Sequence, residues 1–314
     1  MNGAIGNPAR GVIWASATAL SYSLSAIVGK DLLDNLGTDS LLFWRFGLAS
    51  IVLWVGLAIR RPSEGVRTAG VSPLLSLVLG ATFGILVYVG FLSLERLDAS
   101  VYIVIVYVYP VLVVVVTSLL GHRTAPLTWA ALALVMAGIV LTVPDLFSGN
   151  SEIDMVGVLL AIGQAALFAG FIVVNSRVIP EHANGVVTAA WTVLGAALVL
   201  APMVAWRGLV VPDTGWLIVE VALFALVPTV ISNICFFRAL RFVAPGIVAM
   251  VLTLEVALAI LWSVLFLGES LRAVQYAGAA VVVVAVLLAQ WVGLRDARQR
   301  SALGLDTVGA ASAP

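Results

Sequence analysis

The stretch YIVIVYVYPVLVVVV, residues 102–116, decides the fold of this chain. Its valines and isoleucines would suit a buried strand, but Pro110 in the middle is wrong for a central strand. The same proline is costly inside a helix of a soluble protein. In lipid, an isolated strand leaves its backbone groups unpaired. The segment is therefore predicted to be a membrane helix, in which neighbouring groups satisfy the carbonyl that Pro110 frees.

The composition agrees with a membrane environment. Of the 314 residues, 62% are hydrophobic and 10% are charged, with a mean hydropathy of +1.14. A soluble domain carries about 25% charged residues, so this chain cannot cover itself with a solvated surface. The zero net charge argues against a nucleic-acid partner. A single cysteine, Cys235, excludes a disulfide framework and a cysteine metal cluster.

Apolar runs of the length that crosses a bilayer, about 20 residues, recur along the whole chain. We predict ten, near 11–29, 40–59, 72–94, 99–120, 126–143, 155–175, 185–206, 214–237, 245–267 and 273–293. Arg10 before the first run resembles the start of a signal peptide, but nine further runs favour a retained first helix. The expected fold class is an all-α integral membrane protein with ten transmembrane helices.

Cationic residues predict the orientation in the membrane. With the N-terminus in the cytoplasm, eleven cationic residues fall on the cytoplasmic side, four on the outer side, and Arg45 within the second helix. Ten spans then place both termini in the cytoplasm. Only one of the sixteen cationic residues is lysine, which is consistent with a GC-rich bacterial genome. We expect a multi-pass protein of the bacterial inner membrane.

The chain repeats itself weakly at a fixed offset. A shift of 147 residues places Lys30 on Arg177, Trp44 on Trp191 and Gly121 on Gly268, and a shift of 146 aligns SLERLDA with ALRFVAP. Each half contributes five spans, and because five is odd, the second half enters the membrane from the opposite side. The predicted parts are an N-terminus 1–10, repeats 11–143 and 155–293, an external linker 144–154 and a tail 294–314.

Three motifs stand out: YSLSAIVGK (22–30), LLFWRFGLA with Arg45, and LGES (267–270). On these motifs the chain resembles the drug/metabolite transporter superfamily, of the EamA type. The first is similar to the family's lysine-ending opening, the second to its second helix and the third to its Gly-Glu helix end. The chain departs from the pattern where His122 replaces a usual glutamate and Val256 a usual proline. The resemblance covers roughly residues 11 to 293 and implies a transporter, without a substrate.

Glu255 is the first candidate for a functional residue. It lies ten residues beyond Pro245, hence about 15 Å deep at 1.5 Å per residue, near the centre of a ~30 Å hydrocarbon core. An ionised acid is expensive there, so it should face a cavity, hold a proton or have a partner. We interpret it as a substrate-binding and coupling residue; the alternative is a structural acid, neutral or paired with Arg45.

Tyrosines of the opening stretch form the second candidate group. Tyr102 and Tyr109 are seven residues apart and share one helical face, whereas Tyr107 is expected to point elsewhere. This face suits a pocket for an amphipathic molecule. The alternative is a belt of interfacial aromatic residues.

Other intramembrane residues are weaker candidates. Ser232 and Asn233 follow Pro228 by about one turn, and Ser232 alternatively repairs backbone bonding. Gly80 and Gly84 form a small-residue pair that predicts close helix packing, and Tyr88 continues their face. The remaining candidates are Trp14, Tyr22, Gln164, Phe168 and Asn175.

The function that fits these features is a secondary transporter, working by alternating access, that exports amino acids or related metabolites. The alternatives are a multidrug or cationic-compound exporter and, less well supported, a membrane-embedded enzyme. His122 and His182 are the only histidines and lie at membrane edges, so no catalytic or metal site is predicted. We expect no cofactor and no ATP. The sequence leaves open whether protons drive transport or the solute runs down its own gradient.

Overall fold

The computed structural model describes residues 8–60, 72–97, 99–121, 125–143, 154–180, 183–267 and 272–302, and every regular element in these ranges is helical. The helices of the first half are α1 (Pro8–Ser23), α2 (Ser25–Arg60), α3 (Pro73–Leu94), α4 (Ala99–Val106), α5 (Tyr109–Leu119) and α6 (Pro126–Thr142). Those of the second half are α7 (Met155–Val178), α8 (Gly185–Arg207), α9 (Gly215–Ala225), η2 (Leu226–Ile231), α10 (Ser232–Leu240), α11 (Pro245–Leu252), α12 (Leu254–Leu267) and α13 (Ala273–Ala302). The prediction of an all-α fold is confirmed.

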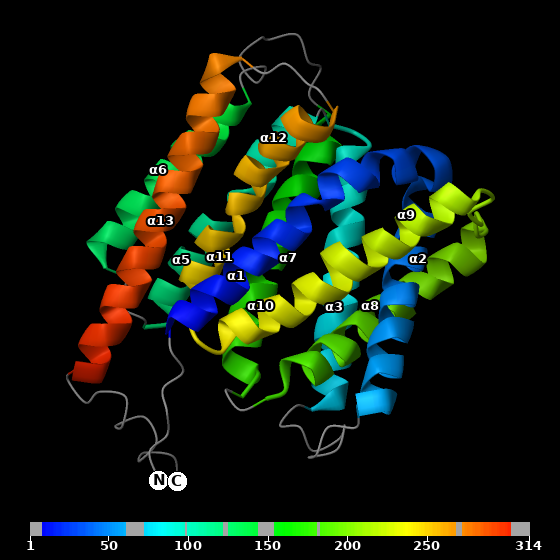
Figure 1. The fold of residues 1–314 in the computed structure, drawn as a ribbon, viewed down its shortest axis with the longest axis horizontal. Coiled ribbons are helices and arrows are strands. Elements are labelled where there is room, and N and C mark those ends of the chain that lie inside the picture. Colours follow the sequence, from blue (N-terminus) through cyan, green and yellow to red (C-terminus); the bar gives the residue numbers. More distant parts are fainter. Residues whose placement is uncertain are drawn as a thin grey trace.

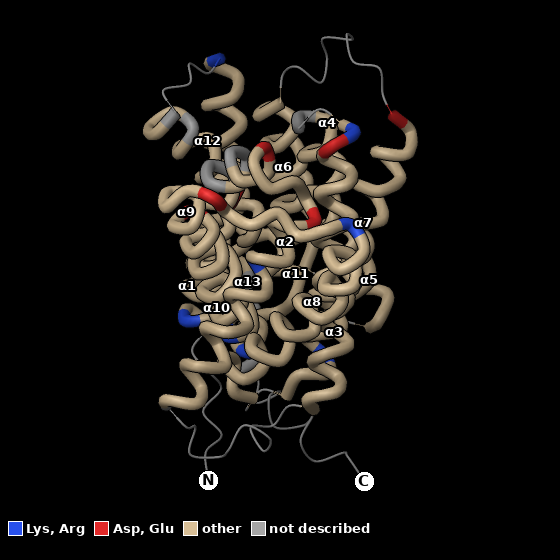
Figure 2. The backbone as a smooth tube through the Cα atoms, turned by 90° about the vertical axis from the view of Figure 1, so that its right-hand side faces the viewer, with Lys and Arg blue, Asp and Glu red and all other residues tan. Residues whose placement is uncertain are grey.

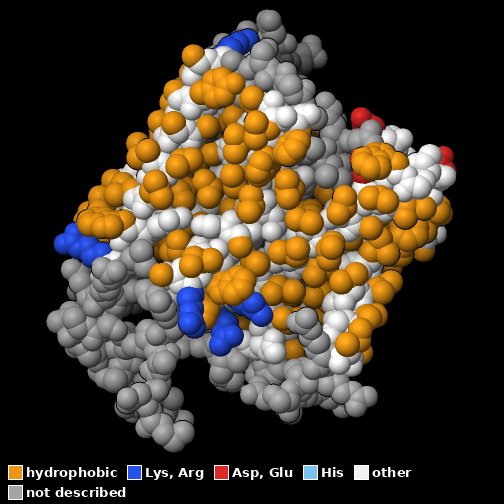
Figure 3. Space-filling model, viewed as in Figure 1, with side chains coloured by type: hydrophobic (Ala, Val, Ile, Leu, Met, Phe, Trp, Pro, Cys, Tyr) orange, Lys and Arg blue, Asp and Glu red, His pale blue; other side chains and the backbone are white. Residues whose placement is uncertain are grey.

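Within the described ranges, eight helical segments are long and apolar enough to cross a membrane, and α6 is apolar but shorter. Large apolar side chains cover the outside of the bundle, as Figure 3 shows for one face. Leu74, Leu159, Leu198 and Leu265 are each more than half exposed, which suits contact with lipid and not with water. The chain is a multi-pass membrane protein.

The first predicted span, 11–29, divides between two helices. α1 ends at Ser23, and α2 begins at Ser25 and is interrupted at Gly37, whose backbone has φ 67° and ψ 165°. A positive φ of this kind favours glycine, so Gly37 separates a helix over 25–36 from one over 38–60. Because the first span is split in this way and α6 is short, the count of ten spans stays a prediction.

The helices pair across the two halves in a reciprocal pattern. Each half has the same order of five predicted spans, so α1 corresponds to α7, α2 to α8, α3 to α9–α10, α4–α5 to α11–α12, and α6 to α13. α3 packs against α7 and α8, while α9–α10 packs against α1 and α2. α5 packs against α7, α12 against α1, and α6 against α13. Each of these contacts is thus matched by its counterpart in the other repeat, as expected for a two-fold relation between the repeats.

Two close approaches show why glycine is needed between α3 and α8. A Cβ atom on Gly80 would overlap the backbone carbonyl of Thr192, and one on Gly195 would overlap the carbonyl of Leu77. Small residues let membrane helices approach each other in this way. The prediction that the Gly80 and Gly84 pair serves packing is confirmed.

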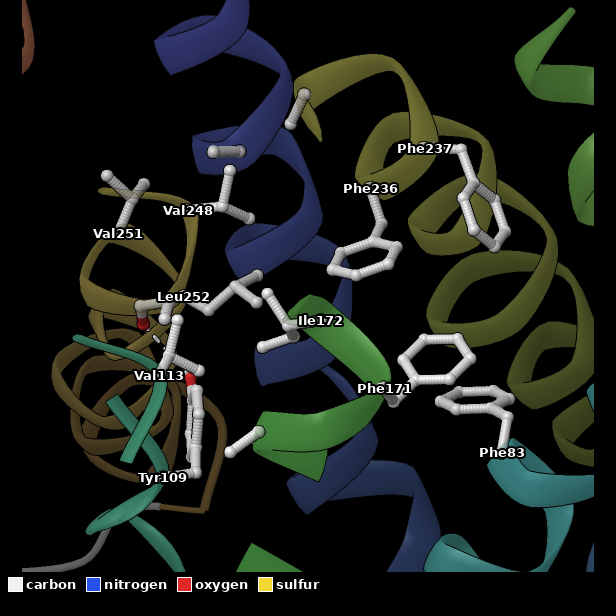
Figure 4. Close-up of a cluster of buried hydrophobic side chains, with 14 of the residues drawn as sticks. Phe83, Tyr109, Val113, Phe171, Ile172, Phe236, Phe237, Val248, Val251 and Leu252 are labelled. Carbon is white, nitrogen blue, oxygen red and sulfur yellow. Dashed lines mark hydrogen bonds between the residues drawn. The ribbon is translucent and has the colours of Figure 1, made fainter. Parts of the chain in front are cut away.

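Aromatic rings fill the centre of the bundle (Figure 4). Phe171 of α7 stacks on Phe83 of α3 at 5.0 Å between centroids and on Phe236 of α10 at 5.8 Å. The stack joins the third helix of each repeat through α7. The three rings belong to the same buried cluster as Tyr109.

Charges and chain ends are distributed unequally along the bundle. The start of α1 and the end of α13 lie at the same end (Figure 1). In Figure 2 the visible acidic residues gather in the half of the bundle away from this end. An even number of crossings accounts for the shared position of the two helix ends.

Candidate functional site: a polar cluster at two broken helices

Two membrane segments are broken at equivalent places. Tyr107 and Val108 form a turn between α4 and α5, and Thr253 separates α11 from α12. The two breaks are 146 residues apart, the offset of the repeat, and α5 packs against α11. Broken helices at the interface of inverted repeats are a common setting for substrate sites in transporters.

The sequence predicted that Pro110 lies inside one continuous helix, and the structure differs. Pro110 occupies the first turn of α5, where the missing N–H would have no helical partner. The rings of Tyr107 and Tyr109 lie 6.0 Å apart, and both tyrosines interact with Glu255. The expectation that Tyr107 points away from the candidate group is wrong, because it assumed an unbroken helix.

Glu255 lies in the first turn of α12, directly after the break at Thr253. Its half-buried carboxylate accepts a hydrogen bond from the Tyr107 hydroxyl. The positive end of the α12 dipole also favours an acid at this position. The break therefore gives Glu255 two stabilising neighbours, one from each repeat.

Tyr109 and Tyr102 are held by partners on other helices. Tyr109 is 2% exposed, and its hydroxyl donates to the carbonyl of Ala249 on α11 at 3.1 Å (Figure 4). Its ring lies 4.7 Å from that of Phe168 on α7. The hydroxyl of Tyr102 donates to Oε1 of Gln164 at 2.9 Å. Four predicted site residues thus line the contact of α4–α5 with α7 and α11.

Arg45 is the buried cation of the cluster. Only 6% of its surface is exposed. Its Nε donates to the Thr229 hydroxyl at 2.8 Å, and Nη2 donates to the Pro228 carbonyl at 3.2 Å. The rings of Phe224 and Phe46 lie 4.8 and 5.4 Å from the guanidinium carbon, a favourable arrangement for a cation. Arg45 of the first repeat is thereby anchored on the second.

The anchor exists because Pro228 disturbs the helix around it. Proline lacks the N–H that would bond the Phe224 carbonyl, and the chain widens into the π-helical turn η2. The Thr229 hydroxyl donates to that carbonyl at 3.3 Å, and Ser232 donates to the Pro228 carbonyl at 2.7 Å. A π-helical turn of this kind often marks a functional site.

Tyr22 links the cation to the acid. Its hydroxyl is hydrogen-bonded to that of Ser232, and it lies close enough to Arg45 and Glu255 to feel both charges. Arg45 and Glu255 also interact electrostatically with each other. In the described part of the chain, however, the only ion pairs within 4.0 Å are Arg96–Asp154 and Arg207–Asp39. The predicted alternative, a direct pair of Glu255 with Arg45, is not formed.

The structure connects seven of the predicted site residues. These are Glu255, Tyr109, Tyr102, Gln164, Phe168, Tyr22 and Ser232.

Three predicted site residues have other surroundings. Tyr88 is hydrogen-bonded to Asp39, Asn233 donates to the Thr229 carbonyl and Asn175 to the Phe171 carbonyl. Both amides donate to a carbonyl four residues earlier in the chain, so in this conformation they serve the backbone.

Three members of the cluster were missed as site residues. Tyr107 was hidden by the helix break, and Thr229 by the π-helical turn. Arg45 was visible in the family-like LLFWRFGLA motif, which was the available signal. His122 and His182 lie outside the described residues, among which no group of three or more His, Cys, Asp or Glu side chains converges.

Known proteins resemble this chain over most of its length. The threonine/homoserine exporter RhtA of Escherichia coli (strain K12) is 24% identical over 286 residues, which cover 87% of this chain and 90% of the relative. The pseudopaline exporter CntI of Pseudomonas aeruginosa (strain UCBPP-PA14) is 23% identical, covering 88% and 94%. A crystal structure shares the fold with a TM-score of 0.78 at 17% identity, over 91% of this chain and 98% of that one.

The family model of EamA-like transporters matches twice, at residues 9–143 and 155–291. Each match covers one half of the reciprocal helix pattern, which agrees with the two-repeat architecture. The same matches show that the function is that of a transporter and not of an enzyme. This chain belongs to the EamA-like transporter family.

Proposed function

We propose that this protein exports a small amino acid or a related metabolite by alternating access. The observation that carries the proposal is the cluster of mutually interacting side chains Arg45, Tyr22 and Glu255 where the two repeats meet. A site at this interface is exposed to either side as the repeats rock against each other. The site contains the charges of Arg45 and Glu255 together with several aromatic rings, which suits a small solute with polar and apolar parts.

The relatives support both the solute class and the direction. RhtA is a threonine/homoserine exporter, and threonine and homoserine are small amino acids. CntI is also named an exporter. Their identities of 24% and 23% leave the particular solute to be determined by experiment.

We further propose that both termini lie in the cytoplasm and that residues 144–154 face outward. The eleven-to-four distribution of cationic residues supports this orientation. The common position of the start of α1 and the end of α13 agrees with it (Figure 1). The boundaries 1–10, 11–143, 144–154, 155–293 and 294–314 remain our proposal for the parts of the chain.

Protons are the proposed coupling ion, with Glu255 as the group that carries them. A carboxyl group inside the bundle exchanges a proton more readily than its neighbouring hydroxyl groups. Glu255 would then release the solute to the outside and carry a proton inward, so that export needs no ATP. Tyr107 and the α12 N-terminus would stabilise Glu255 while it is charged.

Counterflow in liposomes tests this function. Purified protein is reconstituted into vesicles loaded with one unlabelled solute, and entry of the same labelled solute is measured. We expect counterflow with threonine, homoserine or another small amino acid, and none with sugars. Counterflow with a cationic dye and with no amino acid would favour the multidrug alternative and overturn the proposal.

A further inference from the structure

Arg45 has more hydrogen-bonding capacity than the protein uses. A guanidinium group carries five N–H donors, and two of them bond the Thr229 hydroxyl and the Pro228 carbonyl. Among the described residues, the other donors have no hydrogen-bond acceptor, and both bonded partners are neutral. A buried cation without an anionic partner is costly. This site therefore favours the arrival of an anionic group.

Glu255 presents the complementary case. Its carboxylate has about four lone-pair positions, and the Tyr107 hydroxyl supplies one donor. Within the described residues, no cation lies within the 4.0 Å ion-pair distance of it. Glu255 is half-buried, and it is near enough to Arg45 for each to act on the other's charge. An acid and a cation thus lie close enough to interact electrostatically without forming an ion pair.

We infer that Arg45 binds the carboxylate of the transported solute and Glu255 binds its ammonium group. This inference rests on the proposed function, and it deepens it by naming the required chemistry: a solute with a free carboxylate and a free amine. The planar guanidinium fork matches a carboxylate in a way that lysine does not. Tyr22 interacts electrostatically with both Arg45 and Glu255 and is hydrogen-bonded to Ser232. In this arrangement Tyr22 lies beside the solute, between its two ends.

Both ends of the solute would also bridge the repeats. Arg45 belongs to α2 of the first repeat but is fixed by η2 of the second. Glu255 belongs to α12 of the second repeat but is bonded to Tyr107 of the first. A zwitterion held at both ends would therefore bind well only when the two repeats close around it. A solute that lacks one charge leaves one of these links unsatisfied.

A ligand series on the wild-type protein tests the inference without any variant. Counterflow is inhibited with the best amino acid of the panel, for example L-threonine, with its amide, which lacks the carboxylate, and with its N-acetyl derivative, which lacks the ammonium. We expect each derivative to inhibit roughly tenfold less well or worse, since each loses charge-assisted bonds. Equal inhibition by all three compounds would overturn the inference while leaving amino-acid transport intact. Absence of counterflow with every amino acid would overturn the proposed function instead.

Two variants then assign each charge to its residue. Arg45→Gln should bind the amino acid and its amide equally, while still discriminating against the N-acetyl derivative. Glu255→Gln should bind the amino acid and its N-acetyl derivative equally, while still discriminating against the amide. Arg295→Gln is the matched control, because Arg295 lies 5.4 Å from the ring of Trp291 on α13, apart from the cluster; it should keep both preferences. The assignment is wrong if Arg45→Gln still prefers the amino acid to its amide. It is also wrong if each variant loses the preference over the amide and the preference over the N-acetyl derivative to the same extent.

Discussion

The Tyr107 hydroxyl donates a hydrogen bond to the Glu255 carboxylate, and this bond joins the break in one repeat to the break in the other. Each residue is placed by the interruption of its own helix: Tyr107 by the turn before α5, and Glu255 by the start of α12. In the proposed alternating-access cycle, movement of one repeat relative to the other would stretch or re-form this contact. The pair is therefore suited to report which way the transporter is open.

Removal of this hydroxyl should impair transport without unfolding the protein. Tyr107→Phe keeps the ring but leaves the Glu255 carboxylate without its donor, and a hydrogen bond to a charged group contributes about 1.5–3 kcal/mol. We expect counterflow to fall about tenfold. Tyr276→Phe is the control, because Tyr276 is 48% exposed on α13. Equal rates for the two variants would leave the Tyr107–Glu255 bond without a role in transport.

Neutralising the acid should separate coupling from folding. Glu255→Gln keeps the shape of the side chain but can neither carry a proton nor attract an ammonium group. We expect it to lose accumulation driven by a pH gradient and to transport equally slowly across the pH range. Glu95→Gln is the control, because Glu95 accepts a bond from Thr38 at 2.6 Å, apart from the cluster. Wild-type accumulation by Glu255→Gln would reduce the residue to a structural one.

The sequence alone was sufficient for the helices but not for their interruptions. Long apolar runs fix where helices must lie, because lipid offers the backbone no other partners. Pro110 and Pro228 mark the disturbed segments in the sequence, but the local pattern does not encode which turn forms at Tyr107 and at Thr229. Glu255 and Tyr109 were found because burial of a polar group is conspicuous in an apolar segment. Tyr107 was misjudged because a helical wheel assumes an unbroken helix.

A side chain at Gly80 should destabilise the bundle. A Cβ atom there would overlap the Thr192 backbone, which cannot move aside as a flexible side chain would. Forcing extra volume into a packed contact costs about 1–3 kcal/mol. Gly80→Ala should therefore melt at a clearly lower temperature in detergent. Gly47→Ala, where a Cβ would meet nothing within 4 Å, should not, and similar melting of both would contradict the close approach of α3 and α8.

The proposed orientation is testable because the chain has one cysteine, Cys235, which is buried. After its replacement by alanine, single cysteines are introduced at 150 and at 298, positions that lie outside the residues with described side chains. In intact cells, an impermeant thiol reagent should label position 150 and not position 298. Labelling of both positions from outside would contradict the odd number of crossings, five, that is proposed between position 150 and position 298.

Acid should weaken one link between the repeats at the surface. Asp154 caps α7 by accepting bonds from the N–H groups of Val156 and Gly157, and it pairs with Arg96 at 3.2 Å. These donors hold the pKa of Asp154 below its usual range. A lowered pKa in the folded state means that the contribution to stability is complete above the pKa of the unfolded chain and is lost as the pH falls through the folded one. The difference in melting temperature between wild type and Asp154→Asn should therefore shrink as the pH is lowered into the acid range. Asp213→Asn, at an exposed position, is the control; a difference for Asp154→Asn that stays constant down to acid pH would show that its charge contributes nothing to this link.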